Sequence, residues 1–344
     1  MLLSVSTIHP RPKPARFLRA IGRLMAFLLF LMVGLWCFGA VYFDGPFVSD
    51  RGNFLMACIW SLGTLIFPFF TKSKLGSWIV RSVCVLAVAV PWSFIQPTND
   101  RAWEPEYARE PHATISGDAV TIGNFRNFDY KPNGSVIERW ETRVVHLTNL
   151  CGVDLVVNYW GSALMAHPIV TFDFGSDGHV AFSIETRRKK GDIYTTLGGL
   201  FKKYQLIYLA CDERDVIRVR TNYRPEDVSF LYKLNLPPDI RRERFLEYID
   251  VINQLQKKPR FYNVITTNCT TSIRAQIRPA DRKPFDWRML ANGHMDEMLY
   301  ERGIIVSKFP FPELKKRSNI MKTAQAADQA PDFPTRIRAQ FESQ

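Results

Sequence analysis

One cysteine of the chain, Cys269, lies in a setting that suits a nucleophile, within the stretch FYNVITTNCTTSIRAQIR at 261–278. Residues 261–265 are aromatic and β-branched and predict an extended entry, and 270–276 can continue as a helix. Asn268 suits the N-cap, so Cys269 is expected in the first helical turn. There the unpaired N–H groups and the helix dipole favour a thiolate and could hold an oxyanion. A small buried apolar cysteine is the alternative.

A thiolate nucleophile usually works with a histidine that takes up its proton and returns it to the leaving group. His167 is the candidate, because it follows the loop GSALMA and opens a predicted strand. The other histidines after residue 100 are His112 in a linker, His146 inside a strand, His179 at a turn and His294 on a surface helix. A strand-start His facing a helix-start Cys is typical of papain-like sites. A hydrogen-bonded His at a strand end is the alternative.

A carboxylate that could orient the imidazole follows from a predicted hairpin. Residues 168–174 and 179–185 read as strands around the turn GSDG. Pairing 174 with 179 places 167 opposite 186, one position from Glu185, which is the only carboxylate on the return strand. We therefore expect Glu185 to orient His167. A surface ion pair with a neighbouring arginine is the alternative.

Further residues are expected to bind the substrate. Arg218 and Arg220 share one face of a strand predicted at 216–220, and with Arg187 they could hold a phosphate or carboxylate through bidentate contacts. A solvated face paired with nearby acids is the alternative. Trp160, at the end of another predicted strand, and Asn268 complete the expected substrate-binding set. The chain has no CxxC motif, so neither a structural zinc site nor a cofactor is expected.

Three apolar segments must carry this site. Residues 24–43 and 53–71 are uncharged runs long enough to cross a membrane, and 76–96 is a weaker candidate that contains Arg81 and Pro91.

Their orientation follows from the basic residues. Arg11, Lys13, Arg16, Arg19 and Arg23 precede the first span, and Lys72 and Lys74 lie between the second and third. The loop between the first two spans has one basic residue, Arg51, against two acidic ones, Asp44 and Asp50. The positive-inside rule then predicts that residues 1–23 are cytoplasmic and that everything after residue 96 is outside.

The net charge of +12 and the cysteines narrow the class further. Residues 1–96 hold 9 Lys/Arg and 2 Asp/Glu, hence +7, which leaves +5 for the rest. The mildly basic outer part suits an anionic membrane surface, and without a nucleic-acid motif no nucleic acid is expected as a partner. Cys151, Cys211 and Cys269 lie outside the spans, and an odd number in an oxidising compartment leaves at least one thiol free or bridged between chains. Pairing of Cys151 with Cys211 would leave Cys269 free, but the sequence does not decide it.

The outer part predicts an α+β domain at 120–314 after a linker at 97–119. It would combine a mostly antiparallel sheet with helices, one of them at 238–258 with an apolar stripe. Residues 315–344 are charged, then poor in apolar residues, and are expected to form a flexible tail.

Several blocks resemble a bacterial family of membrane-linked proteins grouped with the N-terminal extracytoplasmic domain of Lnb, the lipoprotein intramolecular transacylase. They are GNFRNFDY, VDLVVNYWGS, AHPIVTFDF, SIETRRKKGD, GLFKKYQLIYLACDERDVIRVRTNYR and FYNVITTNCTT, between about 123 and 278. The His-before-Cys order is similar to circularly permuted papain-like enzymes such as lecithin-retinol acyltransferase. The resemblance implies an acyl-transfer site with Cys269, His167 and, in the SxExR block, Glu185. Here three spans precede the domain, whereas Lnb has further spans after it.

Together these features predict a membrane-anchored cell-envelope thiol acyltransferase or lipid-directed acyl hydrolase that acts on a membrane lipid or lipoprotein. It would lie in the bacterial inner membrane, with the N-terminus inside and the permuted papain-like domain in the periplasm. A papain-like peptidase or amidase acting on cell-wall or peptide substrates is one alternative. A non-catalytic envelope scaffold is another. The acyl donor, the acceptor and the oligomeric state are not determined by the sequence.

Overall fold

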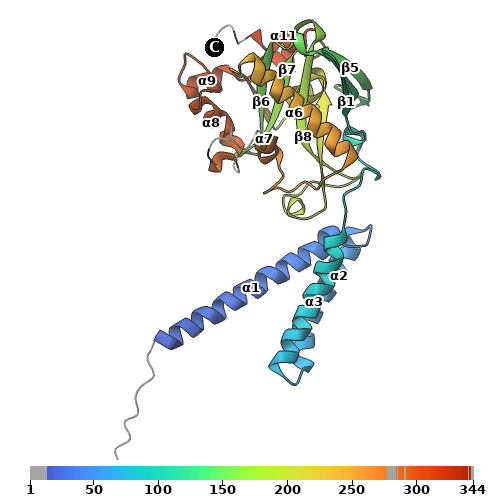
Figure 1. The fold of residues 1–344 in the computed structure, drawn as a ribbon, viewed down its shortest axis with the longest axis vertical. Helices are drawn as coiled ribbons and strands as arrows, with labels where there is room; N and C mark the ends of the chain where they lie inside the picture. Colours follow the sequence, from blue (N-terminus) through green and yellow to red (C-terminus); the bar gives the residue numbers. More distant parts are fainter. Residues whose placement is uncertain (1–13, 277–283, 285, 290–291, 340, 342–344) are drawn as a thin grey trace, which may run out of the picture. The chain divides into compact units, whose positions relative to one another are not determined.

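A computed structural model of the chain describes residues 14–276, 284, 286–289, 292–339 and 341 (Figure 1). The chain divides into two compact units. The first comprises Met1–Gln96 and Phe201–Lys203, and the second comprises Pro97–Leu200 and Tyr204–Gln344. The first unit holds the apolar helices, and the second holds the candidate site.

Long apolar helices make up the first unit. They are α1 Pro14–Asp44, α2 Asp50–Ile66 with the 3-10 turn η1 Phe67–Phe70, and α3 Lys74–Phe94. Among the described residues, three helices are long and apolar enough to cross a membrane, namely Phe17–Asp44, Asp50–Phe70 and Lys74–Phe94. These agree with the spans expected at 24–43, 53–71 and 76–96, except that α1 begins earlier.

A short segment distant in sequence, Phe201–Lys203, belongs to this unit. The ring of Phe201 stacks on that of Phe43, with centroids 5.2 Å apart. The backbone N–H of Lys202 donates to a carboxylate oxygen of Asp44 at 2.9 Å, and its ammonium group donates to the carbonyl of Trp92 at 2.8 Å. These contacts hold Phe201–Lys203 against the ends of α1 and α3 within the first unit.

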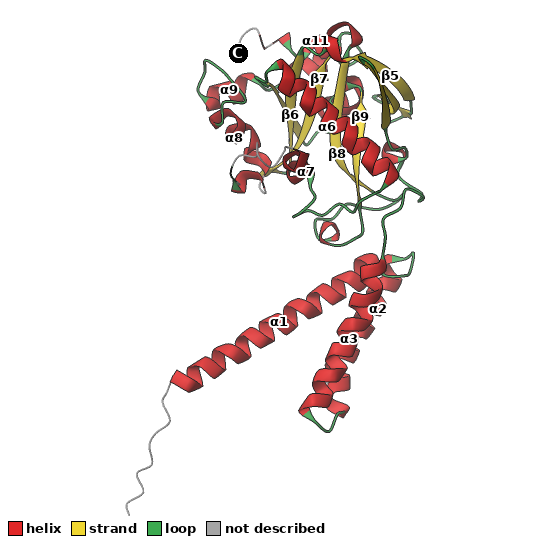
Figure 2. Ribbon diagram, in the orientation of Figure 1, coloured by secondary structure: helices red, strands yellow, loops and turns green. Residues whose placement is uncertain are grey.

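The second unit is built on one eight-stranded sheet, beside which β3 and β4 pair only with each other (Figure 2). The unit has ten strands in its described part. Its strands are β1 His112–Ser116, β2 Ala119–Arg126, β3 Asp129–Tyr130, β4 Val136–Ile137, β5 Trp140–His146, β6 Gly152–Trp160, β7 Ser162–Asp173, β8 His179–Arg187, β9 Gln205–Cys211 and β10 Asp227–Lys233. In the described part of the chain, the sheet runs β1-β2-β9-β8-β7-β6-β10, with β5 also beside β2. All of its pairs are antiparallel except β2 with β9.

Helices cover both faces of this sheet. They are α4 Glu213–Val216, α5 Arg218–Asn222, α6 Pro238–Lys257, α7 Cys269–Gln276, α8 Met295–Glu301, α9 Phe311–Arg317, α10 Met321–Ala326 and α11 Phe333–Arg336. The expected α+β class with a mostly antiparallel sheet is therefore confirmed.

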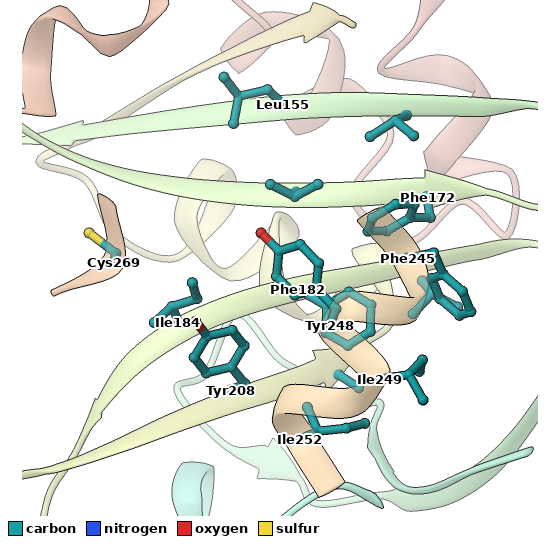
Figure 3. Packing of buried hydrophobic residues seen from close by; sticks show 14 of the residues in the cluster. Leu155, Phe172, Phe182, Ile184, Tyr208, Phe245, Tyr248, Ile249, Ile252 and Cys269 are labelled. Atoms are coloured by element: carbon teal, nitrogen blue, oxygen red, sulfur yellow. The ribbon is translucent and has the colours of Figure 1, made fainter. Parts of the chain in front are cut away.

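The amphipathic helix α6 closes one face of the sheet (Figures 1 and 3). Its apolar residues recur every three to four positions and so form one stripe, as the sequence predicted. The ring of Phe245 lies 5.2 Å from that of Phe172, and Tyr248 stacks on Phe182 at 4.8 Å. Figure 3 shows Cys269 at one side of this cluster, so the core fixes the element that carries the thiol.

Residues 315–339 differ from the flexible tail that the sequence predicted for 315–344. They form the end of α9, then α10 and α11, and they bury Ile320, Ala324 and Phe333 against the other face of the sheet. Arg338 reaches Asp154 and Glu213. The few apolar residues of this segment point to one side, and its charge meets buried carboxylates. Composition alone does not reveal either feature.

The expected linker at 97–119 also differs, because it joins the fold. It contains β1, which pairs with β2, and Trp103, Tyr107 and Glu110 are buried within it. An amide side chain on α6 holds β1 in place, since Asn253 exchanges two hydrogen bonds with the backbone of Ala113. Its prolines and charges therefore mark turns and internal partners rather than a free connection.

The strand predicted at 216–220 is wrong, because these residues lie in α4 and α5. Asp212 caps α4 by accepting the N–H of Arg214. Val216 and Ile217 are fully buried under the sheet, so their β-branched character reflects packing rather than a strand. Arg218 and Arg220 consequently do not share a strand face.

Candidate active site

A tight loop delivers Cys269 to the start of α7. The side-chain oxygen of Asn263 accepts the backbone N–H groups of Ile265 and Thr266, both at 3.0 Å, which forms an Asx turn. The backbone groups of Asn263 and Thr267 also bond to each other. The chain therefore reverses immediately before the helix, and Cys269 is its first residue, as the sequence predicted.

Asn268 caps this helix. Its Oδ1 accepts the N–H of Thr271 at 2.8 Å, and the Thr271 hydroxyl accepts the N–H of Asn268 at 2.9 Å. Its Nδ2 donates to the carbonyl of Val264 at 2.8 Å. The amide of Asn268 thus holds the loop and the first turn together, and the substrate contact expected of it stays a prediction. The N–H of Cys269 itself, at the first helical position, suits an oxyanion.

The β7–β8 hairpin brings a histidine and a carboxylate side by side. Asp173 pairs with His179, one position from the expected register, because the turn spans 174–178. The pairing ends at Ile169 with Ser183. Continuing that register places Glu185 opposite His167, closer than the sequence had predicted. His167 lies inside β7 rather than at its start.

A chain of polar contacts links these two residues. His167 Nε2 lies 2.7 Å from Ser183 Oγ and 3.3 Å from Glu185 Oε1. Ser183 donates its hydroxyl to Glu185 Oε1 at 2.6 Å, and Arg220 donates to the same oxygen at 2.7 Å. We call these four residues the His167 cluster. All four side chains are shielded from solvent, so the contacts act at low dielectric.

The electrostatics of the cluster favour a charged imidazole. Burial lowers the pKa of His167, but the Glu185 carboxylate outweighs this and, with a hydrogen bond to Cys269, raises that pKa to about 9. Burial would raise the pKa of Glu185, yet His167 and Arg220 hold it well below its usual value. Around neutral pH, an imidazolium–carboxylate pair therefore lies beside the thiol.

The thiol meets this pair where β7 and β8 separate. α7 contacts both strands, and Cys269 and His167 are only 7% and 9% exposed. Cys269 is close enough to raise the pKa of His167, and because Nε2 faces Ser183 and Glu185, Nδ1 is the nitrogen available to sulfur. A protonated His beside a Cys is the arrangement that stabilises a thiolate nucleophile.

Two predicted substrate-binding arginines turn inward instead. Arg187 Nη1 bonds Glu110 at 2.5 Å, and Arg218 Nη2 bonds Asp129 at 2.6 Å. Both arginines are only 1% exposed, so these guanidinium groups serve internal carboxylates rather than an external anion. Arg220 joins the site, but through Glu185.

Trp160, the remaining predicted substrate contact, is half-buried at the end of β6 and pairs with Ser162 and Asp227 in the ladders. On the same strand, Asn158 pairs with His167. The sheet therefore places Trp160 near the end at which His167 lies. No contact joins it to Cys269 among the interactions of the described residues.

Two site residues had escaped the sequence analysis. Ser183 begins the SxExR block, and its two-residue spacing from Glu185 could have indicated a shared strand face. Asn292 donates its amide Nδ2–H to Cys269 Sγ at 3.4 Å. Asn292 lies 23 residues beyond Cys269, at the start of the short 3-10 helix η8 Asn292–His294, and no local pattern marks it.

Cys269, the candidate nucleophile, has a free thiol, and this does not depend on a disulfide between the other cysteines. All six, each in the described part of the chain, are free. Cys151 is exposed and Cys211 is buried, so the disulfide that the sequence left open is not formed.

Residues 137–293 match the model of a family described as the Lnb N-terminal periplasmic domain. This match confirms the resemblance expected from the sequence, and its range includes His167, Glu185, Cys269 and Asn292. No match was found among curated proteins or among solved structures. With the three apolar helices, the match supports a membrane-associated envelope protein with a periplasmic domain.

Proposed function

We propose that the protein is a membrane-anchored thiol acyltransferase or lipid-directed acyl hydrolase of the cell envelope. The observation that carries this proposal is the buried group formed by Cys269, His167 and Glu185, in which a thiol, an imidazolium and a carboxylate follow one another. This order of nucleophile, base and orienting acid defines a catalytic triad irrespective of fold. The His-before-Cys order of a permuted papain-like fold is part of the proposal.

The chemistry begins with attack of the Cys269 thiolate on the carbonyl carbon of an ester. A C–S bond forms, and the carbonyl electron pair moves to oxygen. When this intermediate collapses, the C–O bond to the leaving group breaks, and His167 gives that oxygen its proton. An amine or water then attacks the thioester and gives a proton to His167, while Glu185 holds the imidazole in place. The thiol is released, and the acyl group has moved to the acceptor.

Exposed apolar side chains on segments that lead to the site favour an acyl chain over a peptide. Leu164 and Met165 lie in β7 just before His167, and Ile265 lies four residues before Cys269. We call the following exposed residues the apolar rim: Leu164 at 55%, Met165 at 43%, Ile193 at 79%, Leu197 at 64% and Ile265 at 57%. Exposed apolar side chains on the segments that carry the candidate catalytic residues are consistent with a contact to lipid or another apolar partner.

The loop at 191–200 lies against the segment that leads to Cys269. The N–H of Val264 donates to the carbonyl of Gly199 at 2.9 Å, and the amide of Asn263 donates to that of Leu200 at 3.2 Å. This loop therefore carries Ile193 and Leu197 on a segment that is bonded to the entry of the Cys269 helix, which supports an acyl chain as part of the substrate.

The location in the inner membrane, with the N-terminus inside, belongs to the same proposal. Its support is the excess of Lys and Arg before the first helix and between the second and third. In that orientation, the second unit faces the compartment in which lipoproteins and outer-leaflet lipids are available.

The experiment uses the detergent-solubilised full chain and p-nitrophenyl laurate, an activated ester with a long acyl chain. We expect Cys269→Ala and His167→Ala each to abolish release of nitrophenol, and the double variant to be no worse, because groups that share one chemical step are non-additive. Wild-type protein quenched early should carry a lauroyl group on Cys269 by mass spectrometry. His146→Ala, a change at an exposed histidine bound to Asp177, is the matched control.

Other outcomes separate the alternatives. Wild-type turnover in Cys269→Ala would overturn the proposal. Faster cleavage of a peptide amide than of the ester would indicate the peptidase alternative. A folded protein with no acyl-enzyme and no turnover on either probe would indicate a scaffold.

A further inference from the structure

Asn292 presents an oriented hydrogen-bond donor to the candidate nucleophile. Its Oδ1 accepts the backbone N–H of Ala166 at 3.0 Å, and its Nδ2 lies 3.4 Å from Cys269 Sγ. Because a backbone N–H can only donate, it must face the amide oxygen, and this fixes the direction of the NH₂ group toward sulfur. The amide of Asn292 thus bonds both to the strand that carries His167 and to the thiol of Cys269.

The segment that carries Asn292 is packed too tightly to drift. A Cβ on Gly293 would overlap the carbonyl oxygen of Ala163 and the backbone of Leu164, so only glycine allows this approach. The hydroxyl of Tyr159 donates to the carbonyl of Gly293 at 2.8 Å and also contacts the fully buried carboxylate of Asp296. The donor is therefore held by backbone packing and by a buried tyrosine.

We propose that Asn292 is a catalytic residue that stabilises the oxyanion, together with the N–H of Cys269. This inference rests on the proposed acyl transfer. When sulfur bonds to the carbonyl carbon and the carbonyl electron pair moves to oxygen, the negative charge develops two bonds from Sγ. A donor that already reaches Sγ lies within reach of that oxygen, and it does so in a site with little solvent access. When the intermediate collapses, the charge leaves the oxygen and the Nδ2–H returns to sulfur.

Two substitutions distinguish catalysis from positioning. Asn292→Ala removes both the donor and the acceptor. Asn292→Asp keeps an oxygen for the N–H of Ala166 but places negative charge where the oxyanion forms. An oxyanion role predicts turnover of p-nitrophenyl laurate in the order wild type, then Ala, then Asp, with a loss of roughly 100- to 1,000-fold for Ala. A role limited to holding Ala166 predicts the opposite order of the two variants.

Alkylation of Cys269 by iodoacetamide, which forms no oxyanion, supplies the second readout. We expect Asn292→Ala to change the alkylation rate far less than it lowers turnover, because only turnover passes through an oxyanion. If alkylation and turnover fall by the same factor, or if turnover is unchanged, the proposal is overturned. Asn253→Ala and Asn253→Asp are matched controls, because that amide also bonds a backbone N–H, that of Ala113, away from the thiol. Wild-type turnover in Cys269→Ala would instead overturn the acyl-transfer proposal, whatever Asn292 does.

Discussion

Strand β7 carries two buried ionic clusters that resemble each other in composition and differ in what they can do. Toward one end lies the His167 cluster, with Glu185 and Arg220. Four residues further along, Thr171 bonds Glu213 at 2.5 Å, and Glu213 is paired with Arg338, which also bonds Asp154. We call these four residues the Arg338 cluster. Each cluster contains a shielded carboxylate paired with an arginine, and in each the arginine comes from a segment that follows the β7–β8 hairpin in the chain.

The two clusters differ in the residue that accompanies the carboxylate and the arginine. Arg338 binds Glu213 through two nitrogens, at 2.6 and 2.8 Å, and burial, which would raise the pKa of Glu213, is outweighed by that charge. Both groups keep fixed charges, so the pair can only hold the C-terminal segment on the sheet. In the His167 cluster the third member titrates and touches a thiol. A buried ion pair alone therefore does not indicate a site, whereas an ion pair that governs a proton beside a nucleophile does.

The largest expected effect is on stability, at the Arg338 cluster. Arg338→Ala leaves two buried carboxylates without their partner, and breaking such a pair typically costs about 3–5 kcal/mol. We expect the free energy of unfolding, measured by urea titration, to fall by that amount. Turnover per folded molecule should stay at the wild-type value.

Arg336→Ala is the matched control for this change. Its partner Asp332 lies one helical turn away, and both side chains are about half exposed, so the loss of stability should be much smaller than for Arg338→Ala. Equal losses for the two variants, or a changed pH profile in Arg338→Ala, would contradict the separation of the clusters.

The next effect is on catalysis, at Glu185. Glu185→Gln removes the carboxylate that outweighs burial, so the pKa of His167 should fall from about 9. We expect kcat/KM to drop roughly 10- to 100-fold, as for a lost charge-assisted hydrogen bond of about 1.5–3 kcal/mol. The alkaline limb of the kcat/KM profile should also move to lower pH. An unmoved limb would show that Glu185 does not set the protonation of His167.

The same substitution should change how stability depends on pH. The pKa of His167 is about 9 in the folded protein against an ordinary 6.5, so the folded state binds this proton more tightly. Its contribution to stability is complete below about pH 6.5 and is lost as the pH rises through about 9. Glu185→Gln should flatten this slope in urea titrations between these two pH values, and Arg338→Ala should leave it in place.

The smallest effect is expected at Ser183. Its hydroxyl bridges His167 and Glu185, yet Nε2 already lies 3.3 Å from the carboxylate. Ser183→Ala should therefore lower kcat/KM only severalfold, in line with about 1 kcal/mol for one hydrogen bond. Ser183→Thr, which keeps the hydroxyl, serves as the control. A loss as large as that of Glu185→Gln would mean that the imidazole contacts Glu185 only through Ser183.

Local patterns in the sequence were sufficient for the parts of the site that local physics determines. Capping chemistry predicted the helix start at Cys269, and alternation with turn residues predicted the hairpin that carries His167 and Glu185. The register was off by one, because the number of residues in a turn depends on its backbone angles. Here Gly175 and Gly178 adopt positive φ, and the turn takes in Phe174 as well.

The remainder depends on contacts between distant residues. A run of arginines reads the same whether solvent or a buried carboxylate pairs with it, so the inward turn of Arg187 and Arg218 could not be predicted. Residues from 315 onward have too few apolar side chains to indicate a fold from the sequence. Arg338 stabilises the structure only through its ion pairs with Glu213 and Asp154, which are distant in the sequence. Asn292 acquires its place through a glycine contact that leaves no periodic signal.

The short turn between β7 and β8 has a consequence for how such a sequence can change over evolution. Exposed turns usually accept insertions and deletions, because little depends on their length. Here, inserting or deleting one residue in the turn would shift the pairing of β8 with β7 by one position. Every side chain of β8 would then point to the opposite face of the sheet. Ile184 or Thr186, which belong to the opposite face, would then stand where Glu185 now meets His167. The turn takes no part in the chemistry, but its length determines whether Glu185 faces His167. We therefore expect the number of residues in this turn to be conserved as strictly as His167 and Glu185 themselves.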